Sequence, residues 1–274
     1  STVALIDLLQ RAVAQEPFNG VRRSKWGVLR NTVSQLRATV KPLIDTWFGD
    51  LMGGAMGRWT QTQGTLAFEA RFRLPDGTSV EADFLLLAAD TPDDVRRLLS
   101  LELTGAWVEE AREVDPEVFS GLQGRVNRFP SRIMGGATYP GVSFSTNPPP
   151  LGSFWHDMLT KAPDNAAVFM QPPALLEDGS LNPEAENLAN LAPDYYENLI
   201  AGKTEEWINV YLRNQFGQGN MGRPVFKASF KPSFHVAKEA LHAVPQSLYP
   251  LVVGMDNGLQ AAATVTQRDM RGRV

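Results

Sequence analysis

Two adjacent carboxylates, Glu109 and Glu110, directly follow a compact apolar run, Ala106-Trp107-Val108. This pattern predicts a buried strand that carries acids at its carboxyl end, which is where open α/β sheets place their ligands. In nucleotide-hydrolysing sheets one such acid helps to hold Mg²⁺ and another orients the attacking water. The alternative is a strand followed by a solvated helix start, because acids are favoured near helix N-termini.

Composition limits the classes of protein that the chain can belong to. The 274 residues leave room for one large or two modest domains, and a hydrophobic content of 43% is ordinary for a protein with a buried core. The absence of cysteine excludes disulfides, thiolate catalysis and cysteine zinc sites, and three scattered histidines do not predict a histidine metal site. No apolar run is long enough to span a bilayer. With a formal charge of −4, any contact with nucleic acid must come from local basic clusters.

The elements that position the two acids alternate between strands and helices. This alternation predicts an α/β fold with a mostly parallel sheet flanked by helices and with an added antiparallel hairpin. Strands are expected at 26–29, at 106–108, at 142–146, at 166–170 and in a hairpin over 65–88. Helices are expected from 32, from 91 to about 99, from 115 to about 129, and over 193–202 and 204–216, while 18–25 reads as a loop.

The chain opens with Ser1-Thr2 at the start of a helix, as does the helix directly after the lysine of a phosphate-binding loop, G-x-x-x-x-G-K-[S/T]. The glycines and the lysine are not in this sequence, so helix capping by Ser1 is the alternative. The segment Gly202-Lys203-Thr204 looks like the end of such a loop, but Glu197 stands where the first glycine belongs, and the context is helical. We therefore do not expect a phosphate site there.

Three segments resemble the large terminase subunit of tailed bacteriophages, the motor that pumps DNA into capsids. They are V-L-R-N-T at 28–32, D-V-R-R-L-L-S-L-E-L-T-G-A-W-V-E-E-A-R-E at 94–113, and F-S-T-N-P-P at 144–149. The resemblance is greatest to the form found in short-tailed phages, and it covers nearly the whole chain. The middle segment is long, which makes it the most specific of the three.

The resemblance implies a role for each matching residue. Ser1, followed by Thr2, would be the hydroxyl after the phosphate-loop lysine and a Mg²⁺ ligand. Glu110 would position the water, and Glu109 would be the Mg²⁺-linked acid, at a position where most relatives carry Asp. Arg96, or alternatively Arg97, would be the arginine finger that reaches the γ-phosphate of a neighbouring subunit. The other matching residues are Ser145, Thr146 and Asn147, as the motif that couples hydrolysis to movement, and Asp256, as the first metal-binding acid of the nuclease.

Each of these matches has a structural alternative. Arg96 and Arg97 could be surface charges on a helix, and Asp256 could be a turn residue before Gly258. The segment 145–147 could simply be the turn that ends a strand, which is what Asn-Pro usually marks. Arg125 and Arg128 either contact DNA phosphate or solvate a helix face, and the sequence favours the second.

The resemblance also implies a domain organisation. Residues 1–217 would be a P-loop NTPase-like ATPase domain truncated at its N-terminus, with a helical linker at about 193–217. Residues 218–248 would be a linker, and 249–274 the first strands of an RNase H-like nuclease that uses Mg²⁺ or Mn²⁺. We expect a fragment without the phosphate loop and without most nuclease acids, so the 274-residue chain should neither translocate nor cleave DNA.

The implied function is a viral packaging motor that couples hydrolysis of ATP, with Mg²⁺, to movement of double-stranded DNA into a procapsid, joined to an endonuclease that cuts concatemeric DNA. Its partners would be double-stranded DNA, the portal protein, the small terminase subunit and further copies in a pentameric ring, without a membrane. It would work in the host cell cytoplasm, transiently at the portal vertex. Two alternatives stay open: a non-catalytic assembly or DNA-binding module that keeps the ATPase fold, and a helicase-like DNA translocase.

Overall fold

The computed structural model describes residues 1–51, 56–62, 64–217, 251–256 and 262–267. The chain forms two compact units, Ser1–Asn220 and Met221–Val274. The predicted linker, 218–248, lies outside the described residues. Among the described residues, no helix is both long and apolar enough to cross a lipid bilayer.

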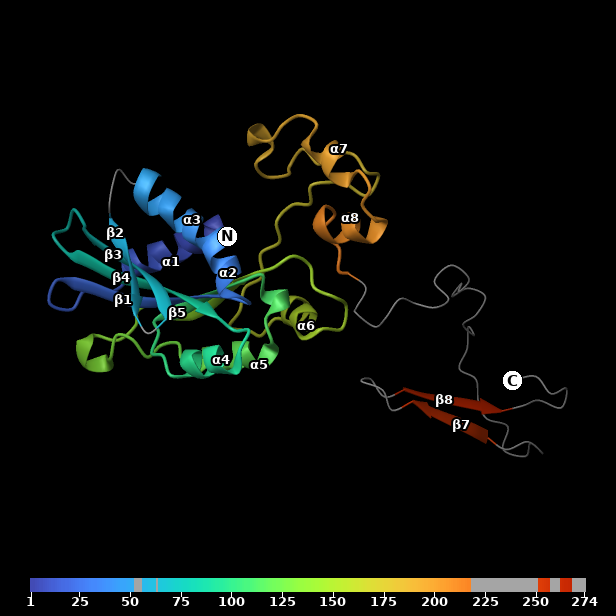
Figure 1. Cartoon of the computed structure of the whole chain (residues 1–274), viewed down its shortest axis with the longest axis horizontal. Coiled ribbons are helices and arrows are strands. Elements are labelled where there is room, and N and C mark those ends of the chain that lie inside the picture. The colour runs from blue at the N-terminus through green and yellow to red at the C-terminus, as the bar shows by residue number, and fades with distance from the viewer. Residues whose placement is uncertain (52–55, 63, 218–250, 257–261, 268–274) are drawn as a thin grey trace. The chain divides into compact units, whose positions relative to one another are not determined.

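The first unit is built around a six-stranded sheet in the order β2-β3-β4-β1-β5-β6 (Figure 1). Strand β1 pairs in parallel with both β4 and β5, and β5 pairs in parallel with β6, whereas β2, β3 and β4 form an antiparallel meander. The predicted α/β class, with a mostly parallel sheet and an added hairpin, is confirmed. The strands are β1 (Val21–Arg30), β2 (Gly57–Thr62), β3 (Thr65–Arg73), β4 (Ser79–Ala88), β5 (Gly105–Glu109) and β6 (Gly141–Ser145).

Because β1, β4, β5 and β6 run in the same direction, the sheet has two distinct ends. Their last residues, Arg30, Ala88, Glu109 and Ser145, define what we term the carboxyl end of the sheet. Their first residues, Val21, Ser79, Gly105 and Gly141, define the amino end.

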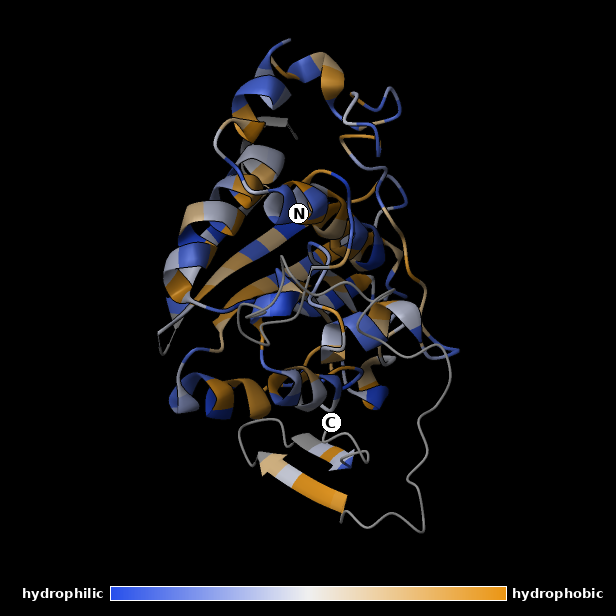
Figure 2. Ribbon diagram, turned by 90° about the vertical axis from the view of Figure 1, so that its right-hand side faces the viewer, coloured by the Kyte–Doolittle hydropathy of each residue, from blue (hydrophilic) through white to orange (hydrophobic). Residues whose placement is uncertain are grey.

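Helices cover both faces of this sheet (Figure 1). Helix α1 (Thr2–Ala14) lies on one face with the helical segment 33–51, and α4 (Pro92–Leu99), α5 (Pro116–Gln123) and α6 (Phe154–Thr160) lie on the other. Hydrophobic and hydrophilic residues alternate along the helices (Figure 2), as expected when one side faces a core. The segment 33–51 comprises α2 (Val33–Gln35), η1 (Leu36–Val40), α3 (Lys41–Asp45) and η2 (Thr46–Leu51); short turns and helices elsewhere are η3 (Ala111–Glu113), η4 (Arg132–Met134), η5 (Leu188–Asn190), α7 (Tyr195–Ile200) and α8 (Glu205–Tyr211).

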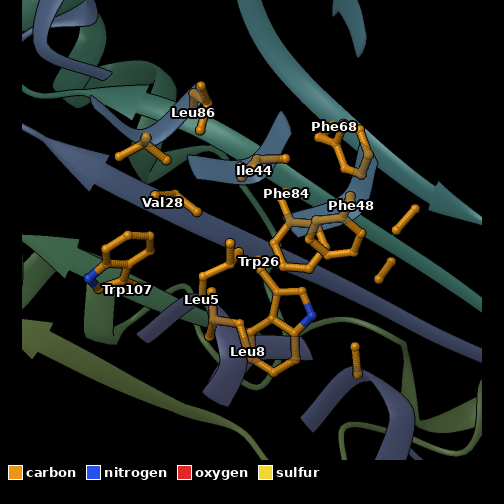
Figure 3. Close-up of a cluster of buried hydrophobic side chains, with 14 of the residues drawn as sticks. Leu5, Leu8, Trp26, Val28, Ile44, Phe48, Phe68, Phe84, Leu86 and Trp107 are labelled. Carbon is orange, nitrogen blue, oxygen red and sulfur yellow. The ribbon is translucent and has the colours of Figure 1, made fainter. Parts of the chain in front are cut away.

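Alternate positions of the central strands supply two separate cores. Trp26, Val28 and Trp107 pack with α1 and the segment 33–51 on one face (Figure 3). Leu29 and Val108 pack with α4, α5 and α6 on the other. Every residue of β5 is buried, which explains why its sequence is a continuous apolar run up to Glu109 rather than an alternating pattern. Each large side chain that is fully buried here stabilises the fold by about 1.5–3 kcal/mol, so the two cores hold β5 rigidly.

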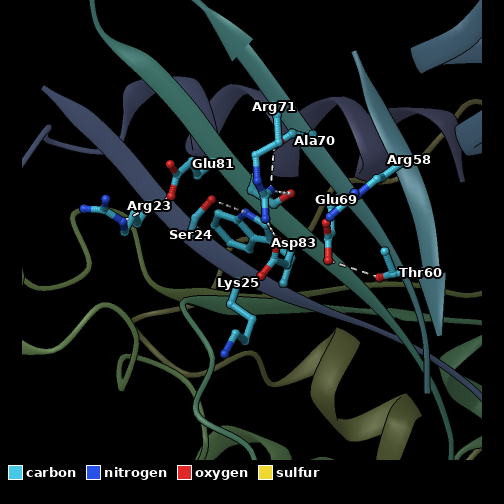
Figure 4. Close-up of polar contacts among 12 residues, drawn as sticks. Arg23, Ser24, Lys25, Arg58, Thr60, Glu69, Ala70, Arg71, Glu81 and Asp83 are labelled. Carbon is cyan, nitrogen blue, oxygen red and sulfur yellow. Dashed lines mark hydrogen bonds and ion pairs between the residues drawn. The ribbon is translucent and has the colours of Figure 1, made fainter. Parts of the chain in front are cut away.

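Strand β1 begins at Val21, so the prediction of a loop over 18–25 was wrong for most of that segment. Its first half looks polar because one face of β1, β4 and β3 is covered by charges that pair across the strands (Figure 4). Arg23 binds Glu81 at 3.2 Å on β4, and Asp83 binds Arg71 at 2.6 Å on β3. A period-two pattern with Ser24 buried and charges on the other side is still a strand.

Further expectations about strands and helices need correction. The predicted strand at 166–170 is irregular chain, and Phe169 is 92% exposed, because no strand of the described part of the chain pairs with it. The helix after Asp115 ends at Gln123 rather than near 129. Strand β2 was not predicted, and the helices near 195 and 205 are shorter than the sequence suggested.

The described part of the second unit is an antiparallel pair, β7 (Leu251–Asp256) and β8 (Ala262–Gln267). Strand β7 is the mostly orange strand of this pair in Figure 2, and its hydrophobic residues are exposed, from Leu251 at 50% to Met255 at 73%. Two strands do not bury a core of their own. An RNase H-like fold for this unit therefore stays a prediction.

Candidate functional site

The carboxyl end of the sheet holds a buried carboxylate that accepts two hydroxyl hydrogen bonds. Glu109 is 7% exposed; its Oε1 accepts from Ser1 Oγ and its Oε2 accepts from Ser145 Oγ. Ser145 also accepts a hydrogen bond from Trp107 Nε1 at 3.0 Å, which leaves its proton directed to Glu109. A residue at the start of α1 and a residue of β6 thus meet on the last residue of β5, far from either in sequence.

Ser1 does not act as an ordinary helix cap. It occupies the N-cap position of α1, but its side chain makes no capping hydrogen bond and donates to Glu109 instead. The helix begins with Thr2, next to this contact. The structure therefore excludes the capping alternative for the Ser1 side chain. The contact also places the N-terminus of α1 beside Glu109, and the unpaired N–H groups and helix dipole at such an end favour anions.

Glu110 lies in a left-handed backbone conformation, with φ 51° and ψ 51°, that residues other than glycine rarely adopt. Its carbonyl accepts from Glu113 N at 2.9 Å, so the chain turns sharply into η3 directly after β5. Such conformations cost about 1–3 kcal/mol and occur disproportionately at functional sites. The Glu110 side chain is only partly exposed, and Asn147 Nδ2 donates to its Oε2 at 3.4 Å.

Burial raises the pKa of Glu110 above its ordinary value, and the like charges of Glu109 and Glu113 add to that rise. Arg30 and Arg112 act in the opposite direction on the same pKa. A carboxylate with a raised pKa is a better proton acceptor than an ordinary surface acid. The two adjacent acids therefore lie in different environments. Glu109 accepts hydrogen bonds from two hydroxyls, whereas Glu110 has a raised pKa that suits it to accept a proton.

The segment after β6 is tied to the turn after β5. Thr146 Oγ1 accepts from Arg112 N at 3.3 Å and donates to Asn147 O at 2.9 Å. Together with the contact from Asn147 to Glu110, these bonds join the ends of the two strands. The three residues predicted as a coupling motif, Ser145, Thr146 and Asn147, are thus all within one hydrogen bond of the two acids or of the turn that carries them.

Arg112 extends this network to α8, and sequence reasoning gave it no role. Its guanidinium donates to Pro148 O at 3.2 Å and to the Tyr211 hydroxyl at 3.1 Å, and it lies 5.4 Å from the centre of the Tyr211 ring. Tyr211 also stacks on Trp207 and lines a cavity of about 460 Å³ that Asn147 borders. The signal was available, because Arg112 follows the two acids within the same motif.

Arg30, at the end of β1, is a second residue to which the sequence gave no role. It donates to Thr39 Oγ1 at 2.7 Å, while its Nε is buried and has no partner among the described residues. Its charge favours the ionised form of Glu110. The signal here was its position, because Arg30 ends a strand that lies beside β5.

Two predicted residues lie outside the cluster. Arg96 on α4 is largely exposed and pairs with Asp93, and Arg97 pairs with Asp94 at 3.5 Å. An arginine finger that acts on a neighbouring subunit need not touch its own site, so this role stays a prediction. Asp256 is the last residue of β7 in the second unit, and its role as a nuclease acid also stays a prediction.

The donor set fits Mg²⁺ as it is usually held beside nucleotides. The hydroxyl of Ser1 and the carboxylate of Glu109 offer hard oxygen atoms, which Mg²⁺ prefers. Among the described residues, no group of three or more Asp, Glu, His or Cys side chains could hold a metal alone. Mg²⁺ commonly takes one or two protein ligands and completes its shell with phosphate and water, so this small set is sufficient.

No protein family profile and no curated protein matches the sequence. Among solved structures, the large terminase of a thermophilic bacteriophage is similar at a TM-score of 0.48 and 12% identity over 89% of this chain and 52% of that one. The complex of the same terminase with ADP gives 0.48 and 13%, over 90% and 53%. The large terminase ATPase domain of Thermus phage P74-26 gives 0.41 and 13%, over 70% and 76%. The chain spans about half the length of the first of these terminases.

Proposed function

We propose that the first unit is the ATPase part of a viral DNA-packaging motor. The observation that carries the proposal is that Ser1 and Ser145 both donate hydrogen bonds to Glu109. The adjacent Glu110 has a left-handed backbone conformation and a raised pKa. This is the arrangement expected if Ser1 follows a phosphate loop and Glu109 is the Mg²⁺-linked acid. The more specific assignment to DNA packaging rests on the resemblance of the three sequence segments to large terminases.

In this proposal Glu110 orients the attacking water and accepts its proton, for which its raised pKa suits it. Bound Mg²⁺, held by Ser1 and Glu109, would neutralise charge on the phosphates. Asn147 contacts Glu110 directly, so a change in the hydrogen bonding of the acid during turnover reaches the end of β6. Arg112 carries the same change to Tyr211 on α8.

We propose the following partners, second activity and location for the complete motor. The partners are double-stranded DNA, the portal protein, the small terminase subunit and further copies in a pentameric ring, with Arg96 acting across subunits. The second unit belongs to an endonuclease that uses Mg²⁺ or Mn²⁺, with Asp256 as one of its metal-binding acids. The motor works in the host cytoplasm at the procapsid portal. These elements rest on the sequence resemblance.

The test is a substitution of Glu110→Gln in the complete product of the gene that encodes these residues. ATP turnover should fall by about 10²–10⁴-fold, because a positioned base contributes that much. ATP affinity, measured by calorimetry, should stay within a few-fold. The matched control is Glu117→Gln, which removes an exposed negative charge at the start of α5 and should leave most of the turnover.

The two alternatives give different results in the same experiments. A non-catalytic module would show no turnover that Glu110→Gln could lower, and this result would overturn the ATPase assignment. A helicase-like translocase would separate the strands of a labelled duplex, whereas a packaging motor moves the duplex without opening it. ATP-dependent strand separation that disappears in Glu110→Gln would therefore replace packaging with unwinding.

A further inference from the structure

The positive charges of this acidic chain are unevenly placed. Its formal charge is −4, yet the stretch from Val118 to His156 contains no Asp or Glu. Its only charged residues, if histidine is counted as neutral, are Arg125, Arg128 and Arg132. Local clusters of this kind are what an acidic protein needs to contact a polyanion.

The three arginines lie in the connection between α5 and β6, at the amino end of the sheet, and backbone hydrogen bonds fix part of this connection. Arg125 O accepts from Leu103 N at 3.0 Å, and Arg128 N donates to Leu103 O at 2.9 Å. Thr104 Oγ1 donates to Phe129 O at 2.8 Å and accepts from Lys25 N at 2.9 Å. Residues 125–129 are therefore a loop fixed by hydrogen bonds, rather than part of the helix predicted from the sequence. A loop that is already fixed loses less conformational entropy when it binds a ligand.

Lys25 adds a fourth cation beside this loop. Its Nζ lies 4.5 Å from the centre of the Phe129 ring. On the charged face shown in Figure 4, Arg23, Arg58 and Arg71 are each paired with an acid of a neighbouring strand. Lys25 forms no ion pair within the described residues, although Asp83 is its register partner, because Asp83 pairs with Arg71.

None of the four cations is neutralised in the described part of the chain. Arg128 and Arg132 are exposed, and Arg125 is partly buried with an Nε that has no partner there. Glu102 is an exposed acid near this end of the sheet, but it forms no ion pair with them in the described structure. Most of the other arginines that the structure describes are paired with an acid; these are Arg11, Arg22, Arg23, Arg58, Arg71, Arg96, Arg97 and Arg213. An unpaired cluster on a rigid loop is therefore a local exception.

We propose that Lys25, Arg125, Arg128 and Arg132, which we term the basic loop, contact the phosphate backbone of duplex DNA. Arginine suits this partner because its planar guanidinium binds phosphate through two parallel hydrogen bonds. The contact is independent of base sequence, because phosphate contacts position a protein without reading bases. That the polyanion is duplex DNA rests on the proposed function, whereas the location rests on the charges and the fixed loop.

The test is a titration of a fluorescein-labelled duplex with the chain, without nucleotide, at several salt concentrations. The triple variant Arg125→Gln, Arg128→Gln, Arg132→Gln should bind at least about tenfold more weakly in moderate salt. Its slope of log affinity against log salt should be shallower by about one for each arginine–phosphate pair removed. The single variant Arg128→Glu, at an exposed position, should weaken binding in the same direction if the triple variant folds poorly.

The matched control removes the same charge elsewhere, with Arg37→Gln, Arg58→Gln and Arg73→Gln at exposed positions. Equal losses of affinity and of salt slope in both triple variants would overturn the basic loop as the contact. A second result would also overturn it. If the triple variant loses binding to vesicles of phosphatidylserine and phosphatidylcholine but keeps its binding to the duplex, the basic loop is a membrane contact. If the unmodified protein binds no duplex at all, the packaging function itself is contradicted.

Discussion

The two ends of the central sheet gather opposite charges by different means. At the carboxyl end, Glu109 and Glu110 are held by side chains from the start of α1 and from the end of β6 that lie far away in sequence. At the amino end, the basic loop is held mainly by backbone hydrogen bonds to residues 103 and 104. The comparison teaches that the first end depends on individual side-chain atoms, whereas the second depends on the shape of a loop. Substitutions should therefore affect chemistry at one end and affinity at the other.

After Glu110→Gln, the largest effect on turnover is expected for Glu109→Gln at the carboxyl end. Ser1 and Ser145 donate to different oxygens of the carboxylate, and glutamine replaces one of these oxygens with an NH₂ group that cannot accept, so one of the two hydrogen bonds is lost. The substitution also removes the charge beside the proposed metal. ATP turnover of the complete gene product should fall by about 10²–10³-fold, the loss seen when one preorganised electrostatic group is removed. The measurement is steady-state phosphate release, with circular dichroism to check folding.

The control is Glu102→Gln, an exposed acid near the other end of the same strand. It loses the same charge and should leave turnover within about twofold, because exposed surface charges contribute little. If both variants lose turnover equally, the two ends do not differ as proposed.

The position of this site could be predicted from the sequence because it needs only the ends of strands. Glu109 and Glu110 were predicted at the carboxyl end of a buried strand, where open α/β sheets place their ligands, and the resemblance added Ser145 at the end of another strand. A parallel sheet brings the carboxyl ends of these strands together, as the structure shows. Arg112 and Arg30 were not given roles, because their contacts depend on where Tyr211 and Thr39 lie in space. No local pattern encodes such distant partners.

The amino end was harder to predict, because tertiary contacts override local preference there. The sequence after Asp115 favours a helix to about 129, yet 125–129 instead bond to the chain at 103–104. The polar start of β1 resembled a loop because its charges pair across strands. The apolar segment 166–170 resembled a strand, but no strand among the residues that the structure describes pairs with it.

The second prediction separates shape from charge at the amino end. Thr104→Val keeps the volume and the charge but removes the hydroxyl that bonds Phe129 O and Lys25 N. Leaving such groups unsatisfied should lower the free energy of unfolding by about 1–3 kcal/mol. Duplex affinity should also fall a few-fold, because the loop keeps its backbone hydrogen bonds but loses the side-chain hydrogen bond that holds Phe129.

Urea unfolding and the duplex titration measure these two effects. The control is Thr160→Val, whose hydroxyl bonds an exposed backbone carbonyl of α6 at 2.8 Å. It should cost less than about 1 kcal/mol, because water can replace that bond, and it should not change duplex affinity. Unchanged affinity in Thr104→Val would mean that charge alone, without the held shape, accounts for binding.

The third prediction concerns how far the carboxyl-end network extends. Tyr211→Phe keeps the ring under the Arg112 guanidinium but removes the 3.1 Å hydrogen bond to the hydroxyl. The free energy of unfolding should fall by about 0.5–1.5 kcal/mol, the net worth of one hydrogen bond. Turnover should change by only a few-fold. Thermal unfolding and phosphate release measure this, with Tyr139→Phe at an exposed position as the control. A loss of turnover as large as that of Glu109→Gln would place Tyr211 within the chemistry itself.

The smallest effect contrasts two acids at opposite ends of the sheet. Burial raises the pKa of Glu110, whereas at the amino end hydrogen bonds from the Thr78 hydroxyl and amide, and then from Arg22, lower the pKa of Asp76 from 3.8 to about 2. A lowered pKa in the folded state stabilises the fold above pH 4, and this contribution is lost as the pH falls from about 4 to 2. Asp76→Asn should therefore flatten the dependence of the urea midpoint on pH in that window. The contribution is small because Asp76 is exposed to solvent.

Asp178→Asn is the matched comparison, because Asp178 makes the same turn with Ser180 but has no arginine partner among the described residues. A flattening as large in Asp178→Asn would show that the turn alone, without the Arg22 contact that joins the start of β1 to the β3–β4 turn, accounts for the shift.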